Sequence, residues 1–365
     1  MTADHEHTEP ATFAIVGGGF RAEAFLRVAA AVPDVFRVTG VMARRAEVRQ
    51  QLGERWSVDT VDALDDLRSG RPDFVVVAVS PSVSTEIIRT LTDAGHAVLT
   101  ETPVAPDLAS SLALLELVRG GARIQVAEQY HLEPLLSAQL EIVRRGVLGA
   151  VSEASVSVAH DYHGMSVMRR ILGVEFENAR ITARRFTERL QDGPSRQGDP
   201  QEDRVVDGIR TSAWLEFDGG LHGTYDFHDQ QYRSWIRTPT LLARGSSGEL
   251  RDETVRHLAD AFTPVTSRIE RIEAGGAGSH EGKFLRSYAF EGDIVYANPF
   301  GRARLADDEL SITSLLARMS AYVRGGAPVY SVAEACQDQY LQLEIRRAID
   351  EGTTVTTTTR PWAVA

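Results

Sequence analysis

The feature that most constrains the fold is a glycine-rich turn near the start of the chain. The run Gly17-Gly18-Gly19-Phe20-Arg21-Ala22 follows a short apolar stretch, Phe13 to Val16, and opens a segment with apolar residues at helical spacing, Phe20 to Val32. Glycine permits the tight turn, and a small alanine lets the helix pack closely on the strand. The pattern therefore predicts a strand, a turn and a helix of a parallel α/β sheet.

The same alternation of short apolar runs and helical patterns continues to about residue 125. Further strands are expected at Val35 to Met42, Phe74 to Val79, Ala97 to Leu99 and Ile124 to Ala127, and helices at Ile87 to Ala94 and Leu108 to Val118. An apolar run such as Phe74 to Val79 is typical of a strand that is buried on both faces. We expect residues 11–128 to form a doubly wound parallel sheet, a Rossmann domain, after a disordered tail at residues 1–10.

The second half of the chain has a different pattern. Strands are expected at Ala154 to Ala159, Ala179 to Phe186, Ala213 to Phe217, Leu221 to Phe227 and Thr240 to Ala243, with helices at Asp307 to Val323 and Val332 to Ile349. The segment from Gln191 to Asp203 is rich in Gly, Pro, Ser and charge and is expected to be a loop. Residues 129–365 are therefore predicted to form an α/β domain around a large, mostly antiparallel, open sheet.

Composition limits the classes of function. The 365 residues are 43% hydrophobic and 25% charged, as in an ordinary globular protein, and are enough for two domains. A net charge of −12 argues against nucleic acid as a partner. The single cysteine, Cys336, cannot form an internal disulfide, and the sequence contains neither a signal peptide nor an apolar run as long as a membrane span. We therefore expect a cytoplasmic protein.

The glycine-rich turn predicts binding of a nicotinamide dinucleotide, because free N–H groups at a helix N-terminus favour a diphosphate. The residues expected to contact the cofactor there are Gly17, Gly19, Phe20, Arg21 and Ala22. After the second strand, Ala43 stands where an NAD site usually has an acidic residue, and Arg44 and Arg45 follow. Arginine at this place can bind a 2′-phosphate, which favours NADP, with NAD as the alternative.

Several further motifs resemble the Gfo/Idh/MocA family, named for glucose–fructose oxidoreductase, inositol dehydrogenase and a rhizopine-catabolism protein. They are Ala78-Val79-Ser80-Pro81, Glu101-Thr102-Pro103, the stretch Gln129 to Pro134, Gly146-Val147-Leu148-Gly149, and His163 ten residues before Gly173. The resemblance implies NAD(P)-dependent redox chemistry on sugars, cyclitols or related polyols. It also implies cofactor contacts from Ser80, Pro81, Glu101, Thr102, Pro103 and Gln129, and assembly into a homodimer or homotetramer through the open sheet.

The chain departs from this family at its catalytic residues. The position of the family's catalytic lysine is Thr102, and the only lysine of the chain is the distant Lys283. The family's aspartate and a further acidic residue fall on Ala159 and Ser166. His163 remains as the expected general base, since the pKa of histidine lies near the operating pH. Three residues could replace the missing partner of His163: Asp161, Tyr162 and Tyr130.

A second polar cluster, Tyr225 to Arg237, combines aromatic rings, carboxylates and arginines of the kind that bind sugars. The expected substrate contacts are His160, Tyr225, Asp226, Tyr232, Arg233 and Arg237. If Arg233 or Arg237 reaches the cleft, an anionic sugar is favoured as substrate. No metal site is expected, because His160 and His163 would point to opposite faces of an extended strand.

These observations lead to three hypotheses of function. The first is an NAD(P)-dependent oxidoreductase that transfers hydride to or from a sugar, cyclitol or related polyol, with His163 at the centre of an atypical site. The second is a redox-neutral enzyme that oxidises a glycoside transiently and cleaves it. The third is a non-catalytic dinucleotide-binding sensor or partner protein, which the loss of the lysine would favour.

Overall fold

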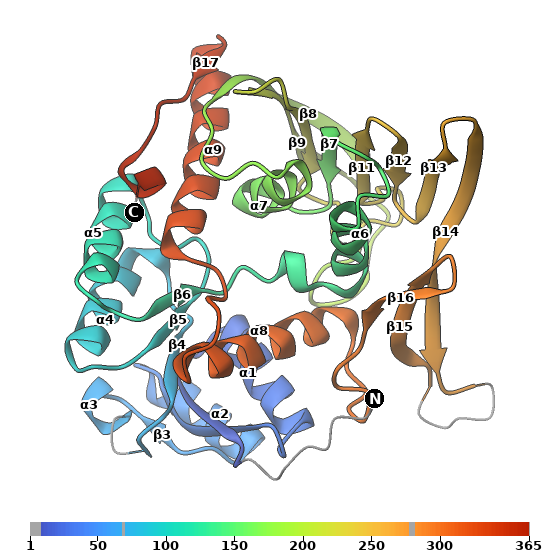
Figure 1. The fold of residues 1–365 in the computed structure, drawn as a ribbon. Coiled ribbons are helices and arrows are strands. Elements are labelled where there is room, and N and C mark those ends of the chain that lie inside the picture. Colours follow the sequence, from blue (N-terminus) through green and yellow to red (C-terminus); the bar gives the residue numbers. More distant parts are fainter. Residues whose placement is uncertain (1–8, 68–69, 277–281, 365) are drawn as a thin grey trace.

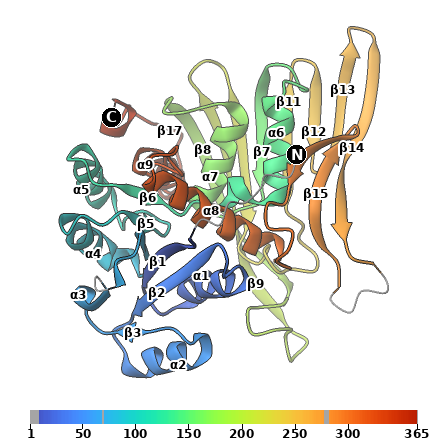
Figure 2. The same ribbon diagram turned by 60° about the horizontal axis from the view of Figure 1, so that its bottom comes forward.

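The apolar runs of the first 130 residues form one six-stranded parallel sheet in the computed structural model, which describes residues 9–67, 70–276 and 282–364. The strand order is β3-β2-β1-β4-β5-β6, so β2 and β3 are added on one side of β1 and β4 to β6 on the other (Figures 1 and 2). The strands are β1 (Ala11–Val16), β2 (Phe36–Met42), β3 (Thr60–Val61), β4 (Phe74–Val77), β5 (Val98–Thr100) and β6 (Ile124–Val126). The expected doubly wound Rossmann sheet is confirmed.

Helices cover this sheet: α1 (Phe20–Ala31), α2 (Ala46–Trp56), α3 (Leu64–Leu67), α4 (Pro81–Asp93) and α5 (Leu108–Arg119). Helix α4 begins at Pro81, six residues before the expected start, because proline is well suited to the first helical position. Gly95 follows this helix at its C′ position with a φ of +85°, which favours glycine there. Helix α2 was not expected, since its only buried residue is Leu52 and it has almost no apolar pattern.

The second half forms an eleven-stranded sheet in the order β16-β15-β14-β13-β12-β11-β7-β10-β9-β8-β17. All neighbours are antiparallel except β7 and β10, which confirms the mostly antiparallel expectation. Its strands are β7 (Val151–Ser157), β8 (Ala179–Gln191), β9 (Val205–Phe217), β10 (His222–His228), β11 (Thr240–Gly245), β12 (Gly248–Arg251), β13 (Thr254–Asp260), β14 (Thr263–Ala274), β15 (Phe284–Phe290), β16 (Asp293–Ala297) and β17 (Val355–Thr356).

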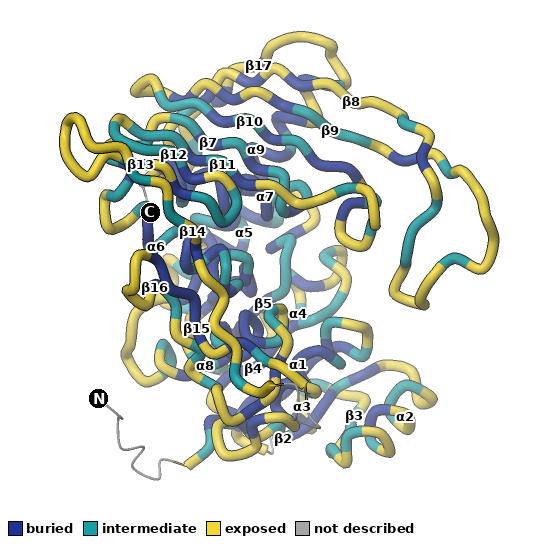
Figure 3. The backbone as a smooth tube through the Cα atoms, turned by 90° about the vertical axis from the view of Figure 1, so that its right-hand side faces the viewer, coloured by how far each residue is buried: buried dark blue, intermediate teal, exposed yellow. Residues whose placement is uncertain are grey.

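The strands from β12 to β16 were not expected from the sequence. Both faces of β14 are largely solvent-exposed, and Ile269 is its only buried residue, so the strand lacks a clear alternation of apolar and polar residues. Strand β9 also begins eight residues before the expected Ala213. Its first half is exposed and pairs only with β8, in a long hairpin that projects from the sheet (Figure 3).

Four helices lie between the two sheets (Figures 1 and 2): α6 (Pro134–Arg144), α7 (Asp161–Leu172), α8 (Asp307–Val323) and α9 (Val332–Glu351). Helix α8 packs on α1, and α9 packs on α5, so the end of the chain returns to the Rossmann domain. The final turn docks through Trp362, which is 1% exposed and donates its indole N–H to Gln337 Oε1 at 2.8 Å.

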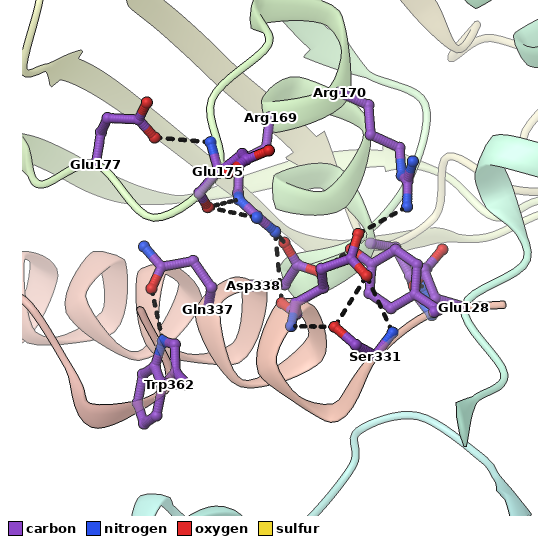
Figure 4. A network of polar contacts seen from close by, with 12 residues as sticks. Glu128, Arg169, Arg170, Glu175, Glu177, Ser331, Gln337, Asp338 and Trp362 are labelled. Atoms are coloured by element: carbon purple, nitrogen blue, oxygen red, sulfur yellow. Dashed lines mark hydrogen bonds and ion pairs between the residues drawn. The ribbon is translucent and has the colours of Figure 1, made fainter. Parts of the chain in front are cut away.

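A buried ion pair joins α7 to α9. Arg169 Nη1 lies 2.6 Å from Asp338 Oδ1, and both side chains are almost fully buried (Figure 4). The Tyr330 hydroxyl also donates to Asp338. Burial raises the pKa of the Asp338 carboxyl to about 6, while Arg169 and Tyr330 oppose this shift. These contacts fix the position of α7, whose first turn carries His163.

Candidate active site

The glycine-rich turn connects β1 to α1 at the carboxyl edge of the Rossmann sheet. Gly17 has a φ of +138°, and a Cβ on it would lie 2.2 Å from the carbonyl oxygen of Ala78. A Cβ on Gly19 would meet nothing within 4 Å, so the space in front of this backbone is open. Ala22 is fully buried, as close packing of the helix on the strand requires. The turn therefore fits a diphosphate at the N-terminus of α1.

Three of the expected cofactor contacts join in one internal network. Arg21 Nε donates to Glu101 Oε1 at 2.9 Å, and Arg21 Nη2 donates to Gln129 Oε1 at 2.8 Å. The Gln129 amide then donates to Asp308 on α8 at 2.6 Å. The Arg21 side chain therefore points to the ends of β5 and β6 and is not free for a phosphate, although its backbone remains in the first turn of α1.

Arg44 and Arg45 directly follow β2, at the same edge of the sheet. Both side chains are exposed, and the described part of the chain provides neither with an ion pair. Arg49 holds the turn by donating to the carbonyl oxygens of Ala43 and Arg44, each at 2.9 Å. Two free cations thus lie beside the strand end where the adenosine ribose of a dinucleotide is bound in this fold.

His163 is paired with a carboxylate that the sequence did not reveal. Its Nδ1 lies 2.5 Å from Glu128 Oε2, and the His163 residue is 8% exposed and Glu128 2% exposed. The other Glu128 oxygen, Oε1, accepts from the Tyr130 backbone N–H at 3.0 Å. Glu128 lies two residues after the end of β6, and this place at the carboxyl edge of the sheet was the available signal. The pair leaves His163 Nε2 as the ring nitrogen that can exchange a proton with a substrate.

A chain of hydrogen bonds runs beside this pair. The hydroxyls of Tyr130 and Tyr232 are 2.7 Å apart, and Tyr232 Oη also lies 2.7 Å from His160 Nδ1. Burial, followed by the charge of His163, lowers the pKa of His160 to about 4, so this ring is neutral at physiological pH. The Tyr130 and His160 rings lie 4.6 Å and 4.9 Å from the His163 ring. Tyr130, His160 and Tyr232 therefore lie together beside His163.

Tyr162, in the first turn of α7, lies near Thr102, the residue at the position of the family's lysine. Its ring is 4.4 Å from that of His163, and it lines the same small cavity as Thr102. Burial raises the pKa of the Tyr162 phenol, so the hydroxyl keeps its proton at neutral pH. With Pro103 and Glu128 it lines a cavity of about 10 Å³, which has room for about one water molecule. Ser80 and Pro81 lie at the start of α4, at the neighbouring strand end.

Asp161 does not orient His163. It begins α7 with a φ of +49°, and its carboxylate lies 3.2 Å from Arg346 on α9. Tyr225 is also structural: it is 2% exposed, packs against Gly164 of α7 and accepts the Asp161 N–H at 2.7 Å. Both residues line a cavity of about 520 Å³ between α9 and the large sheet, and His163 is not part of its lining.

The remaining expected substrate contacts lie elsewhere. Both carboxylate oxygens of Asp226, on β10, accept hydrogen bonds from Arg210 on the neighbouring strand β9. Arg237 donates a hydrogen bond to Glu188 of β8. Asp226 alternates with the buried Tyr225 and Phe227, so it points to the opposite face of the sheet. Arg233 is exposed on the segment after β10. From the second polar cluster, the Tyr232 hydroxyl contacts Tyr130 and His160, which are both neighbours of the His163 ring.

The geometric argument against a metal was wrong, although no metal cluster is found. His160 precedes α7 and His163 lies in its first turn, so their rings are neighbours and not on opposite faces. Among the described residues, no group of three or more His, Cys, Asp or Glu side chains is arranged to hold a metal ion. No helix in the same residues is long and apolar enough to cross a membrane.

Comparison with solved structures supports the assignment of the fold. Levoglucosan dehydrogenase in complex with NADH and L-sorbose superposes with a TM-score of 0.69 at 16% identity, over 97% of this chain and 100% of the other. An NAD-binding oxidoreductase from Klebsiella pneumoniae gives 0.68 at 14% identity, over 96% and 100%. An oxidoreductase from Agrobacterium radiobacter, in complex with NAD⁺, L-tartaric acid and magnesium, gives 0.67 at 15% identity, over 95% and 98%. No curated protein sequence matches.

The first domain also matches a family model at the sequence level. The match covers residues 11–130, and the model describes an oxidoreductase family with an NAD-binding Rossmann fold. This range includes the glycine-rich turn, Arg44 and Arg45, and Glu128 at the end of the sheet. Residues 11–130 are therefore similar to the NAD-binding domain of the Gfo/Idh/MocA oxidoreductases.

Proposed function

We propose that this protein transfers hydride between NADP(H) and a hydroxyl or carbonyl group of a sugar, cyclitol or related polyol, with His163 as the general base. The observation that carries this proposal is the Glu128–His163 pair, which lies beside Thr102 at the carboxyl edge of the Rossmann sheet. The similar solved structures that bind levoglucosan or L-sorbose support a carbohydrate-like substrate.

A nicotinamide dinucleotide held at the glycine-rich turn by the backbone of Gly17, Gly19 and the first turn of α1 would supply the hydride acceptor for oxidation of a substrate C–H bond. His163 Nε2 takes the hydroxyl proton. Glu128 holds the Nδ1 proton and stabilises the positive charge that develops on the ring. Burial of both groups strengthens this electrostatic contribution.

We assign to the Tyr162 hydroxyl the contact with the substrate oxygen that a lysine would otherwise make. The phenol remains protonated at neutral pH, lies beside Thr102 and contacts the His163 ring. Tyr162→Phe removes only the hydroxyl. We expect kcat to fall by about ten- to a hundredfold, because a hydrogen bond to a developing charge contributes about 1.5–3 kcal/mol. Unchanged kcat and KM would remove Tyr162 from the mechanism.

We propose NADP as the preferred cofactor because Arg44 and Arg45 have no ion pair within residues 9–67, 70–276 and 282–364, and Ala43 provides no carboxylate for a ribose hydroxyl. NAD is the alternative, and NADH and NAD⁺ are the cofactors bound by two of the similar solved structures.

The experiment that tests the proposed function is a turnover screen of polyols, sugars and glycosides with NADP⁺ and NAD⁺, followed by the absorbance of the reduced nicotinamide. We expect one class of polyol to be oxidised by the wild type and not by His163→Ala, whose dinucleotide affinity should stay near normal. Added imidazole should restore part of the lost rate. Equal turnover in His163→Ala would contradict the proposed role of His163.

Binding of a dinucleotide without catalysis is the second candidate, because Thr102 stands in place of the family's lysine. A dinucleotide that binds tightly but is neither reduced nor oxidised with any substrate, in either direction, would favour this candidate. Release of an aglycone from a glycoside without net reduction of the dinucleotide would instead favour transient oxidation with cleavage.

A further inference from the structure

The hairpin of β8 and β9 extends well beyond the helices that cover the large sheet. The two strands pair continuously from Ala179 and Phe217 to Gln191 and Val205. Phe186 and Val205, in the projecting part, are 46% and 49% exposed. The tip of this hairpin, residues 192–204, lies beside α1 of the Rossmann domain (Figures 2 and 3).

Contacts within the tip hold it in a defined shape. The Asp192 backbone N–H donates to the Arg204 carbonyl at 2.9 Å, and the two side chains form an ion pair at 2.6 Å. A tight turn joins Ser195 to Gly198, which has a φ of +111°. Arg196 is the residue after Ser195 in this turn, so the hairpin presents it at its end.

Arg196 contacts the glycine-rich turn of the other domain. Its guanidinium carbon lies 4.0 Å from the ring centroid of Phe20, the first residue of α1. Arg196 has no ion pair among the described residues, whereas its loop neighbour Arg204 does. A free cation close to the positive end of a helix is electrostatically unfavourable unless an anion lies between them. The N-terminus of α1 and the Arg196 guanidinium both lie beside the backbone of the glycine-rich turn, and together they would favour an anion there.

We propose that Arg196 is a ligand of the diphosphate of the bound dinucleotide, supplied by the second domain. This inference rests on the proposed function, because it requires a dinucleotide at the glycine-rich turn. Arg21 cannot provide this charge, since its guanidinium is already bonded to Glu101 and Gln129. The hairpin tip would thus contribute one cofactor ligand from the second domain to a site built mainly by the first.

The test compares Arg196→Ala with a matched control on the same hairpin. Arg189 is 76% exposed and lies 3.8 Å from Asp207, so Arg189→Ala removes the same charge at a surface ion pair away from the tip. NADPH and NADH are titrated separately into wild type and both variants, and their fluorescence gives the affinity and the dissociation rate. Thermal unfolding checks that the variants are folded.

We expect Arg196→Ala to weaken binding of both dinucleotides by about tenfold, mainly through faster dissociation, and Arg189→Ala to change neither. The dependence of affinity on salt should also become weaker in Arg196→Ala. Equal affinity of wild type and Arg196→Ala would overturn the assignment while leaving the dinucleotide site intact. A loss confined to NADPH would place Arg196 at the 2′-phosphate and also overturn it. If the wild type bound neither dinucleotide, the proposed function itself would fail.

Discussion

Replacing Glu128 by glutamine tests how His163 is oriented. Glu128 Oε1 accepts the Tyr130 backbone N–H at 3.0 Å, and Oε2 accepts from His163 Nδ1 at 2.5 Å. Glutamine has one carbonyl oxygen and one NH₂ group, so it can accept only one of these two bonds. If its NH₂ faces His163, the imidazole must carry its proton on Nε2, and it can then no longer accept the substrate proton.

We therefore expect Glu128→Gln to lower kcat on the order of 10²- to 10³-fold, close to the full contribution of a general base. The dinucleotide affinity should change by less than about threefold, because Glu128 is not placed at the diphosphate. Single-turnover reduction of the bound dinucleotide measures the chemical step, and fluorescence titration measures the affinity.

Glu133→Gln is the matched control for this variant. Burial, together with the charges of Asp308 and Glu128, raises the pKa of the Glu133 carboxyl to about 8, so it is mostly protonated at pH 7 and glutamine resembles it. Its activity should equal that of the wild type. Full single-turnover activity in Glu128→Gln would refute the reasoning, as would an equal loss in Glu133→Gln.

Three further changes test the cofactor specificity and the stability of the fold. The double change of Arg44 and Arg45 to Ala should weaken NADPH binding by at least tenfold with little effect on NADH, and a parallel loss of both would contradict a contact with the 2′-phosphate. The Glu133 carboxyl binds a proton more tightly in the folded than in the unfolded protein, since its pKa of about 8 exceeds the ordinary value of 4.5. The wild type should therefore lose stability relative to Glu133→Gln as the pH rises from about 4.5 to 8, and equal denaturation midpoints throughout would be inconsistent with this shift. Arg169→Met leaves the Asp338 carboxylate buried without its cation and should lower the free energy of unfolding by about 3–5 kcal/mol in urea denaturation. A change in the free energy of unfolding below about 1 kcal/mol would mean that the Arg169–Asp338 ion pair does not stabilise the packing of α7 on α9.

The Rossmann half was predictable because its signals are local. The apolar run at Phe13 to Val16, the glycines after it and the helical spacing that follows all fall within twenty residues. The alternation of apolar runs with helical segments then indicates a parallel sheet. The strands from β12 to β16 escaped prediction because residues such as those of β14 are exposed on both faces, so burial imposes no alternation.

The candidate site was predictable only where its residues belong to local sequence motifs. His163 and Tyr130 could be identified from their motifs. The partner of His163 could not, because Glu128 is 35 residues away and meets it only when the end of β6 and the start of α7 are brought together. Asp161 was a natural candidate from its neighbouring position in the sequence, but the first turn of α7 directs its carboxylate to Arg346. Arg196 is farther still from Phe20 along the chain, and only the long hairpin brings them into contact.

The proposed hydride transfer depends on binding of a nicotinamide dinucleotide at the glycine-rich turn. Titration of the purified protein with NADPH and NADH, followed by fluorescence, measures this binding. We predict saturable binding of one dinucleotide per chain at micromolar concentrations, with NADPH bound more tightly than NADH. The absence of saturable binding of either dinucleotide at millimolar concentrations would contradict the account, because the turn would then serve only as part of the scaffold.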